Sequence, residues 1–281
     1  MFKIIDKKMI VPNLHLLTVE APAVAKSVQP GQFVIVRASE EGERIPLSVS
    51  DWNADAGTVT MIFMEVGDTT GTLAALESGM SIPTVVGPLG KATQIEKFGT
   101  VVCVGGCYGI GSIYPVARAL KERGNRVITA IESRSSYLFY WEDKLKEVSD
   151  EIIHITRDGT KGYRGHVGRL AEILPSLGPI DRMFINGCTF LLKRGSDVSR
   201  ELGIPTIVNL NPIMIDGTGM CGVCRVSVGS TTRFACVHGP DFDGHQIDWA
   251  ELLQRRKTYM KEEGVPLKTS RCEEHSASLQ E

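Results

Sequence analysis

The sequence lacks a strong excess of charge of either sign. Its 31 Lys and Arg residues nearly balance 33 Asp and Glu residues, so the formal net charge at pH 7 is −2. Because a nucleic-acid-binding protein needs surplus basic residues for the phosphates, this balance argues against a nucleic-acid partner. The 42% of hydrophobic residues and the length of 281 residues instead fit a globular chain of two or three domains.

Long apolar runs are missing as well. The runs near 101–104 and 181–186 are far too short to cross a bilayer, so we expect no membrane span. The N-terminal stretch MFKIIDKKMIVPNLHLL lacks the charged and apolar regions of a signal peptide. The 7 cysteines are odd in number and gather late in the chain, which argues against a secreted disulfide framework. We therefore expect a cytoplasmic protein.

The first segment, residues 1–98, is expected to be mainly β-structure. GQFVIVRA at 31–38, RIPLSVSDW at 44–52 and GTVTMIFMEVG at 57–67 are runs rich in β-branched residues, bounded by turn residues. A short helical pattern interrupts them at 70–79. Several short strands with one helix predict a small antiparallel barrel.

The second segment, residues 99–208, alternates strand and helix patterns. The buried run VVCVGG precedes the amphipathic stretch GSIYPVARALKERG, and RVITAIES follows as a further strand. The alternation continues to IPTIVNL. It predicts a doubly wound parallel sheet with helices on both faces, so the chain is expected to be an α/β protein with a β-barrel.

Two shorter segments complete the expected domain organisation. Residues 209–250 form a small glycine-rich segment that carries three of the cysteines. Residues 251–281 are expected to be a polar helical tail with a mobile end.

The glycine-rich loop VCVGGCYGIGSIYP at 102–115 lies between a predicted strand and a predicted helix. Glycines in such a loop let backbone N–H groups approach a phosphate, and the start of the helix favours anions. The strict G-x-G-x-x-G spacing is absent, and sharp turns also use glycine. Because the required strand and helix are both predicted, we favour dinucleotide binding.

Two charged residues stand at the end of the next strand. Glu132 would hold the ribose hydroxyls of NAD, whereas Arg134 would accept the 2′-phosphate of NADP. A solvated strand end explains both residues about as well. The choice between NAD and NADP therefore stays open.

The barrel segment carries a second group of candidate cofactor ligands. Ser48 lies in RIPLS, and Thr69, Thr70, Gly71 and Thr72 stand at the start of the predicted helix. Their hydroxyls and free N–H groups would suit a pyrophosphate. Taken alone, the same residues are more typical of a strand serine and of helix-capping threonines.

The segment DGTGMCGVCRVSVGSTTRFACVHG at 216–239 has the spacing Asp216-x4-Cys221-x2-Cys224-x11-Cys236. Plant-type [2Fe–2S] proteins use C-x4-C-x2-C…C, so Asp216 stands at the position of the first cysteine. The intervening glycines allow the loop to wrap a cluster. Carboxylate oxygen is a harder ligand than thiolate, but it binds ferric iron. We expect these four residues to hold a [2Fe–2S] cluster.

Zinc is the main alternative for this segment. His238 would complete a tetrahedral site with the three cysteines, although Cys236 and His238 are closer in sequence than zinc ligands usually are. A packing role for three buried thiols is also weaker, because C-x-x-C in a glycine loop rarely serves packing alone.

The order of these parts resembles the ferredoxin–NADP reductase superfamily over roughly the first 210 residues. Within it, the chain is most similar to flavin and iron–sulfur electron-transfer subunits, such as those of dihydroorotate dehydrogenase B and of NADH-dependent ferredoxin:NADP oxidoreductase (sulfide dehydrogenase). The resemblance is carried by RIPLSVSD, GPLGK, VGGCYGIGSIYP, ESRSSYLFYWED, LNPIMIDGTGMCGVCRVSVG and FACVHGPDFDGHQIDW. The dihydroorotate dehydrogenase type carries cysteine at the Asp216 position, so the aspartate favours the second branch.

The resemblance implies FAD in the barrel, NAD(H) or NADP(H) on the second domain, and a [2Fe–2S] cluster that faces a partner. That partner would be a larger flavoprotein subunit with further iron–sulfur clusters, which can reach ferredoxin and can bifurcate electrons. The superfamily arginine stands three residues before the flavin-strand serine, where this chain has Ile45, so Arg44 is the nearest candidate. The cofactor residues implied by position are Arg44, Pro46, Leu47, Ser48, Thr70, Gly71, Thr72, Gly105, Gly106 and Gly109.

Two further departures from the superfamily concern cysteine. Cys107 replaces the third glycine of the nucleotide loop, and Cys188 replaces the proline of a Gly-Pro pair after the fourth strand. Both lie where the resemblance places the nicotinamide.

The expected function is that of an NAD(P)H-dependent oxidoreductase subunit that relays electrons between nicotinamide, flavin and the cluster. No side chain is expected to act as a nucleophile or general base, because the cofactors carry the chemistry. A dihydroorotate dehydrogenase-type subunit, a stand-alone reductase and a zinc-stapled nucleotide-binding regulator remain the alternatives.

Overall fold

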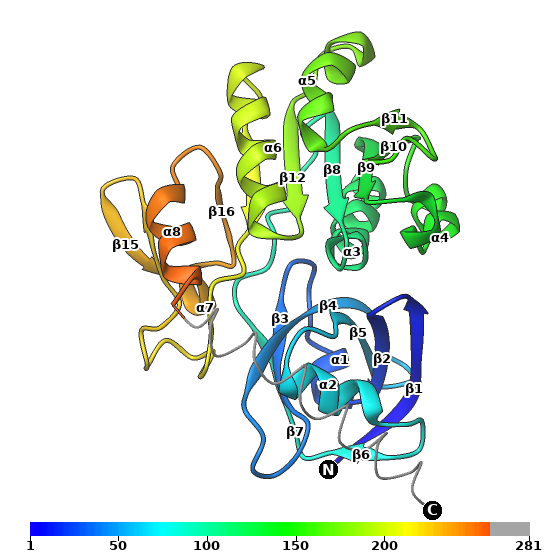
Figure 1. The fold of residues 1–281 in the computed structure, drawn as a ribbon, viewed down its shortest axis with the longest axis vertical. Helices are drawn as coiled ribbons and strands as arrows, with labels where there is room; N and C mark the ends of the chain where they lie inside the picture. The colour runs from blue at the N-terminus through cyan, green and yellow to red at the C-terminus, as the bar shows by residue number, and fades with distance from the viewer. Residues whose placement is uncertain (259–281) are drawn as a thin grey trace, which may run out of the picture.

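The computed structural model describes residues 1–258, which form three regions that follow one another along the chain (Figure 1). In Figure 1 the N-terminal sheet lies below a second sheet, and a small C-terminal region, coloured yellow to orange, lies to one side. The expected mobile end of the tail lies outside the described residues. In the described part of the chain, no helix has the length and apolar character that a membrane crossing requires.

The N-terminal region contains one antiparallel sheet, in the strand order β6-β1-β2-β5-β4-β3-β7. Alternating side chains fill its core, such as Val34 and Val36 from one strand and Val59 and Met61 from another. The expected antiparallel barrel is confirmed. The elements are β1 (Phe2–Val11), β2 (Leu14–Glu20), α1 (Pro22–Ala25), β3 (Phe33–Arg37), β4 (Ile45–Asn53), β5 (Thr58–Met64), α2 (Asp68–Ala75), β6 (Ser81–Ile82) and β7 (Thr84–Leu89).

The second region contains the sheet β11-β10-β9-β8-β12-β13-β16, in which all neighbours but β13 and β16 run parallel. The chain moves from β8 outward to β10 and then returns to β12 on the other side of β8, so the topological switch lies between β8 and β12. The elements are β8 (Thr100–Gly106), α3 (Gly109–Glu122), β9 (Arg126–Ser133), α4 (Glu142–Glu147), β10 (Glu151–Thr156), β11 (Tyr163–Arg164), α5 (Leu170–Ile173), β12 (Arg182–Asn186), α6 (Thr189–Glu201), β13 (Thr206–Asn209) and β16 (Asp241–Asp243).

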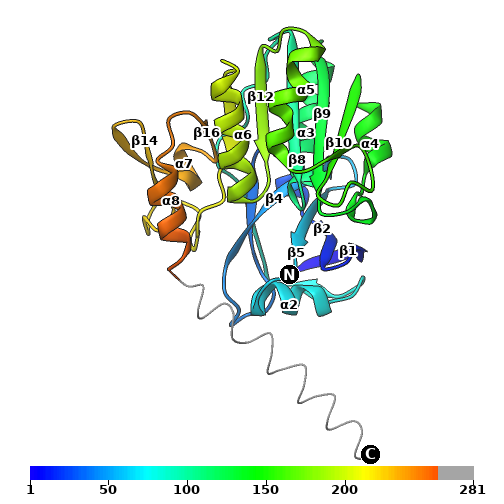
Figure 2. The same ribbon diagram turned by 45° about the horizontal axis from the view of Figure 1, so that its top comes forward.

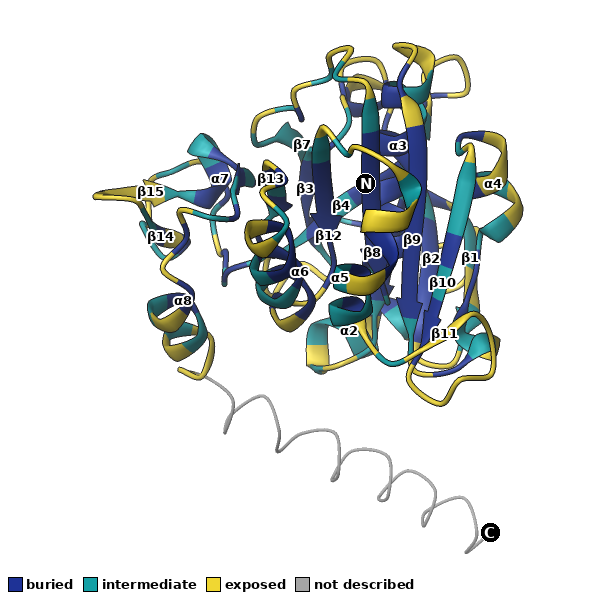
Figure 3. Ribbon diagram, turned by 90° about the horizontal axis from the view of Figure 1, so that it is seen from above, coloured by how far each residue is buried: buried dark blue, intermediate teal, exposed yellow. Residues whose placement is uncertain are grey.

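Helices cover both faces of this sheet, as a doubly wound fold requires. On β8, Cys103 packs with Ile113 of α3, whereas Val104 packs in the core cluster that contains Leu192 of α6. Figure 3 shows β8 and β9 as buried strands between these layers. The predicted doubly wound parallel sheet is confirmed, because consecutive β8 residues are apolar on both faces.

The C-terminal region is built on the hairpin β14 (Arg225–Val228) and β15 (Thr231–Phe234), followed by α7 (Ala235–His238). The chain then adds β16 as an antiparallel edge strand to the second sheet. Helix α8 (Trp249–Arg256) lies on the same side as α6 and the hairpin (Figure 2). The predicted cysteine segment therefore also supplies a strand to the nucleotide sheet.

An ion-pair cluster joins the barrel to the second region. Asp51 on β4 lies 3.0 Å from Arg118 Nη1 of α3 and 2.5 Å from Lys144 Nζ of α4. The Arg118 guanidinium also lies 4.9 Å from the centre of the Trp52 ring. These half-buried contacts hold the two sheets in one relative orientation.

A second junction ties the C-terminal region to the barrel through Asp241. Thr93 donates to Asp241 Oδ2 at 2.6 Å, and Asn209 Nδ2 donates to Asp241 Oδ1 at 2.7 Å. Asn209 also reaches the Gly31 carbonyl at 3.2 Å. Burial of the carboxylate outweighs these hydrogen bonds and raises the pKa of Asp241 to about 6.

The variant Asp241→Asn is expected to lose one component of the pH dependence of stability. Because the folded pKa is raised from 3.8 to about 6, the folded chain holds a proton that the unfolded chain has released. This stability is present in full below the unfolded pKa and is lost as the pH rises through the folded one. At 1.36 kcal/mol per pKa unit the loss amounts to at most about 3 kcal/mol.

Chemical denaturation of both proteins between about pH 4 and pH 7 measures this effect. Relative to wild type, the free energy of unfolding of Asp241→Asn should rise over that range and level off above it. A constant difference between the two proteins would show that Asp241 does not titrate with a raised pKa.

Candidate functional site

The loop that carries the first two predicted iron ligands lies directly against the barrel. Gly217, Gly219 and Gly222 have φ values of +81°, +88° and +67°, in the left-handed region that glycine adopts readily. A Cβ atom at Gly217 would lie 2.8 Å from Ile35 Cγ1 and 2.9 Å from Leu89 Cδ1. The loop therefore packs on β3 and β7 at a point where only glycine fits.

Two of the three predicted cysteine ligands meet in the structure. Cys224 Sγ and Cys236 Sγ lie 3.2 Å apart, and both residues are buried. Burial and the neighbouring Cys224 thiol raise the pKa of Cys236 to about 12, while the Gly219 N–H group donates to its sulfur. A bound ferric iron would offset the cost of ionising this thiol, because the metal replaces the thiol proton, which is released to solvent. Cys221 is exposed at the rim of the loop.

Asp216 presents one occupied and one open carboxylate oxygen. Its Oδ2 atom accepts hydrogen bonds from the Thr218 N–H at 2.9 Å, from the Thr218 hydroxyl and from the Met220 N–H at 3.4 Å. These bonds, with Thr218 as the largest cause, lower the pKa of Asp216. The Oδ1 atom makes no hydrogen bond within the described residues. The carboxylate is thus ionised and oriented, with one oxygen open to a ligand.

The donor set fits a two-iron cluster better than a single zinc ion. The segment offers one carboxylate oxygen and three thiols. Among residues 1–258, no group of three such side chains meets at one metal position. In a two-iron cluster each iron takes two protein ligands, so three side chains need not meet at one metal position. His238 Nδ1 accepts a hydrogen bond from the Phe234 N–H at 2.9 Å. In the neutral ring the proton then lies on Nε2, so His238 offers no free lone pair to zinc.

The predicted flavin strand lies next to this loop. Pro46 and Ser48 pair with Ile35 and Phe33 across the β3–β4 ladder, so these four side chains share one face. Leu47 points to the opposite face and is buried in the barrel core. Because Ile35 also contacts Gly217, the strand and the cluster loop meet at the same face.

Arg44 also belongs to the meeting point of strand and loop. The side chain is exposed, and its positive charge lowers the pKa of Asp216. This electrostatic effect is weaker than that of the hydrogen bonds from Thr218, and within residues 1–258 Arg44 and Asp216 form no ion pair.

The predicted pyrophosphate turn forms the start of α2. Thr70 Oγ1 accepts hydrogen bonds from the Val66 and Gly67 N–H groups at 2.9 and 3.0 Å, and Thr72 Oγ1 donates to the Asp68 carbonyl at 3.0 Å. These hydroxyls stabilise the helix end. A Cβ atom at Gly67 or at Gly71 would meet nothing within 4 Å, so the backbone is open to a ligand there. The fit to a pyrophosphate rests on backbone donors.

The glycines of the nucleotide loop are required by packing within the chain. A Cβ atom at Gly105 would lie 2.9 Å from Ile110 Cα, one at Gly106 2.3 Å from Leu191 Cδ1, and one at Gly109 2.1 Å from the Asn186 carbonyl oxygen. The glycines thus let α3 and α6 approach the ends of β8 and β12. That edge of the sheet is the topological switch, where ligands bind in open α/β sheets.

Glu132 and Arg134 take different positions at the end of β9. Glu132 is 6% exposed, and its Oε2 atom accepts a hydrogen bond from the Val167 N–H at 2.7 Å. Burial raises the pKa of Glu132. Arg134 is exposed. Glu132 thus ties β9 to the next turn, and only Arg134 is open to a ligand phosphate.

Two tyrosines at the nucleotide loop were not identified from the sequence. The Tyr140 hydroxyl accepts a hydrogen bond from the Gly111 N–H at 2.8 Å and donates to the Cys107 carbonyl at 2.9 Å. The Tyr108 hydroxyl accepts a hydrogen bond from Asn211. The aromatic run YLFYW after a strand was the available signal for Tyr140, but nothing in it identifies a contact with the loop.

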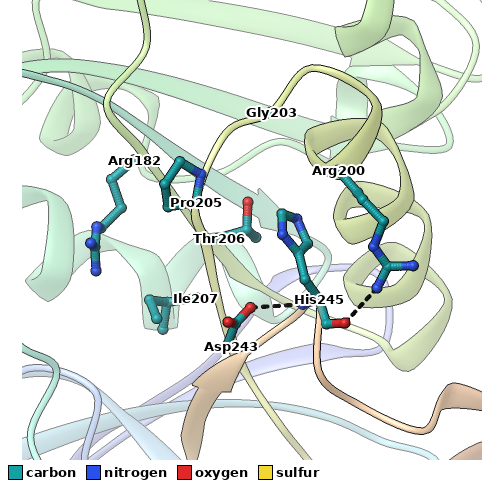
Figure 4. Close-up of a pocket in the computed structure, with 8 residues that line it drawn as sticks. All are labelled: Arg182, Arg200, Gly203, Pro205, Thr206, Ile207, Asp243 and His245. Atoms are coloured by element: carbon teal, nitrogen blue, oxygen red, sulfur yellow. Dashed lines mark hydrogen bonds between the residues drawn. The ribbon is translucent and has the colours of Figure 1, made fainter. Parts of the chain in front are cut away.

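A cavity of about 320 Å³ lies apart from these sites, where β12 and β13 begin (Figure 4). Its polar groups bind one another: Arg200 Nη2 donates to the His245 carbonyl at 2.6 Å, and the His245 N–H donates to Asp243 at 2.9 Å. The cavity lies where the parallel strands begin, whereas the glycine loop lies where they end, so the cavity is not part of the expected cofactor region.

Comparison with known proteins covers nearly the whole chain. Residues 211–248 match the iron–sulfur cluster binding domain of dihydroorotate dehydrogenase B. A Thermotoga maritima protein named as a homolog of the dihydroorotate dehydrogenase B (NAD(+)) electron transfer subunit is 41% identical over 94% of this chain and 93% of its own length. The electron transfer subunit of Desulforamulus reducens is 27% identical over 89% of this chain and all of its own length.

Solved structures agree with this relationship. A chain of the NADH-dependent reduced ferredoxin–NADP oxidoreductase, a structure described for flavin-based electron bifurcation, superimposes with a TM-score of 0.90 at 40% identity, over 95% of this chain and 97% of its own. A ferredoxin–NADP⁺ reductase from Neisseria gonorrhoeae shares the fold at 17% identity and a TM-score of 0.59, over 72% of this chain and 90% of its own.

The cluster-binding domain and the ferredoxin-reductase fold imply FAD, NAD(P)H and a [2Fe–2S] cluster as the cofactors. These were the cofactors expected from the sequence. The chain belongs to the family of dihydroorotate dehydrogenase B electron-transfer subunits and their homologues, oxidoreductase subunits that transfer electrons within larger complexes.

Proposed function

We propose that this chain is the flavin and iron–sulfur subunit of a complex like NADH-dependent ferredoxin:NADP oxidoreductase. The observation that carries the proposal is Asp216, which stands at the first ligand position with one carboxylate oxygen open. The 40% identity over nearly the full length of a chain of that oxidoreductase supports this branch. Two relatives named as dihydroorotate dehydrogenase B electron transfer subunits without qualification, from Desulforamulus reducens and Bacillus mycoides, are 27% and 28% identical.

The residues divide the work between two adjoining segments. When bound, FAD exchanges hydride with the nicotinamide, and the cluster carries single electrons onward. The chain holds these groups on the β3–β4 face and on the 216–236 loop, which contact each other through Ile35 and Gly217. The proposed flavin-binding strand and the proposed cluster loop therefore pack directly against each other.

The partner is proposed to approach the exposed side of the cluster loop. Met220 is 87% exposed and Ile215 is 50% exposed, and the exposed Cys221 lies beside Met220 in the chain. Exposed apolar side chains beside an electron carrier fit a protein interface better than free solvent. We assign this face to a larger flavoprotein subunit with further iron–sulfur clusters, through which ferredoxin is reached and electrons are bifurcated.

Native purification with analysis of flavin, iron, sulfide and nucleotide tests this function. The proposal expects FAD and a [2Fe–2S] cluster in the chain and a second flavoprotein that copurifies with it. Isolation as an active reductase without a partner would favour a stand-alone enzyme. A colourless protein with one zinc ion per chain would contradict the electron-transfer role.

Replacement of Asp216 is expected to change the cluster itself. Asp216→Cys should retain a [2Fe–2S] cluster with altered visible and EPR spectra, because thiolate is a softer donor than carboxylate. Asp216→Asn can keep the hydrogen bonds to the loop but is a weaker ligand, so cluster content should fall. Iron and sulfide analysis together with EPR of the reduced protein measures both effects.

The chain offers a matched control for this experiment. Asp158 accepts hydrogen bonds from the Thr160 N–H and hydroxyl at 3.0 and 2.7 Å, in a second Asp-Gly-Thr turn far from the cysteines in sequence. Asp158→Asn and Asp158→Ala should leave the cluster unchanged. If Asp216→Ala also left content and spectra unchanged, Asp216 would not be a ligand.

Removal of the Tyr140 hydroxyl is expected to weaken nucleotide binding. Tyr140→Phe leaves the Gly111 N–H and the Cys107 carbonyl without their partner, at a cost of about 1–3 kcal/mol in the free energy of unfolding. A looser loop should raise the Kd of NAD(P)H several-fold while FAD and cluster content stay constant. Calorimetric titration measures the Kd.

Tyr114→Phe is the control for the loss of a hydroxyl. Tyr114 is buried, its ring packs against Trp141, and its hydroxyl makes no hydrogen bond in the described part of the chain. Equal losses of nucleotide affinity in both variants would show that Tyr140 does not position the loop.

A further inference from the structure

Helix α8 contacts two separate parts of the proposed electron path through two consecutive arginines. Arg255 Nη2 donates to the Val223 carbonyl at 2.9 Å, in the turn between Cys221 and Cys224. Arg256 Nη1 donates to Thr189 Oγ1 at 2.6 Å and to Asn211 Oδ1 at 2.8 Å. Because neighbouring helix residues point about 100° apart, one helix end reaches in both directions.

Asn211 extends the reach of Arg256 to both loops of the topological switch. Its Nδ2 group donates to the Tyr108 hydroxyl in the β8–α3 loop and to the Gly187 carbonyl in the β12–α6 loop at 3.1 Å. The same side chain accepts from Thr189 at 3.2 Å. Arg256 thus holds the Asn211 side chain, which joins the β8–α3 and β12–α6 loops where the nicotinamide is expected to bind.

The helix is itself firmly attached, so it can transmit this restraint. Asp248 Oδ1 accepts a hydrogen bond from the Glu251 N–H at 2.9 Å and caps the helix start. Trp249 is buried and donates from Nε1 to the Gly244 carbonyl at 3.1 Å, and Leu252 is buried beside it. The two arginines lie in the last turn, where positive charge also suits the helix dipole.

In the described part of the chain, the surroundings of these arginines are basic. A cavity of about 270 Å³ adjoins the helix end, and its lining includes Arg225, Arg255 and Arg256 but no carboxylate. Within residues 1–258 neither Arg255 nor Arg256 takes part in an ion pair. A [2Fe–2S] cluster with anionic ligands is itself negatively charged, so uncompensated positive charge at Val223 favours its reduced form.

We propose that Arg255 and Arg256 are a pair of positioning residues that hold the cluster turn and the nicotinamide loops in one fixed relation. Arg256 positions the nicotinamide end through Asn211, and Arg255 positions the C-x-x-C turn and raises the reduction potential of the cluster. This inference rests on the proposed function, because both sites must be occupied for the pair to act.

The test uses the full-length holoprotein and two single variants. Each variant is expected to change one readout, nucleotide affinity or cluster potential, and to leave the other unchanged. Arg256→Met should raise the Kd of NADH about tenfold, the effect of losing charged hydrogen bonds, and leave the EPR spectrum and potential of the cluster unchanged. Arg255→Met should shift the EPR lines and make the midpoint potential more negative, while the Kd of NADH stays within twofold of wild type. The lysine variants should each restore part of the loss, because they keep the charge.

The control variant is Gln254→Met on the same helix, whose side chain is exposed and makes no hydrogen bond in the described structure. It should match wild type in both readouts. If both arginine variants changed both readouts equally, the helix would serve stability alone and the paired assignment would be wrong. If both matched wild type, the positioning role would be excluded while the proposed function stood.

A wild-type holoprotein that binds neither NADH nor NADPH, or that lacks a cluster, would overturn the proposed function and this inference with it. Thermal unfolding of each variant separates local repositioning from general loss of fold. A variant that fails to fold is replaced by its lysine counterpart. The lysine variant at position 256 must then change only the Kd, and the one at position 255 only the cluster potential.

Discussion

The contact between the cluster loop and the barrel is the constraint on which the arrangement of the electron path depends. Gly217, with φ at +81°, lies where a Cβ atom would come within 2.8 Å of Ile35. Any side chain there would push the loop off β3 and carry Asp216 away from the proposed flavin-binding strand. The buried Asp241 junction secures the same C-terminal region to the barrel from its other end. One glycine and one carboxylate thus bring segments that are distant in sequence into contact.

The nucleotide end is organised by the topological switch between β8 and β12. Packing requires glycine at positions 105 and 106 at the end of β8 and at position 109 at the start of α3, so the loop after β8 lies close to the end of β12 and to α6. Tyr140 is hydrogen-bonded to the β8–α3 loop, and Asn211 is hydrogen-bonded to both this loop and the β12–α6 loop. Such buried polar contacts are specific because an unmatched partner is costly. The same loops carry Cys107 and Cys188, two of the departures from the pattern that the resemblance to the superfamily implies.

The barrel, the parallel sheet and the cluster segment were all predictable, because alternation and helical periodicity are local properties of each segment. Strand β16 was not, since three residues carry no periodic signal and pair only because β13 offers an open edge. The site residues divide in the same way. Thr70 lies at the predicted helix start, but its hydroxyl serves the helix cap, and Glu132 lies at the predicted strand end, but its carboxylate is buried under Val167.

By itself, the sequence determined the order of the three regions and the identity and spacing of the proposed iron ligands from Asp216 to Cys236. These follow from covalent distance along the chain, which folding does not change. Only the tertiary structure decided which distant polar groups meet: Arg118 and Lys144 come to Asp51, and Arg256 comes to Asn211. Such pairs join segments that no local pattern connects, because their contact depends on how the barrel, the sheet and helix α8 pack together.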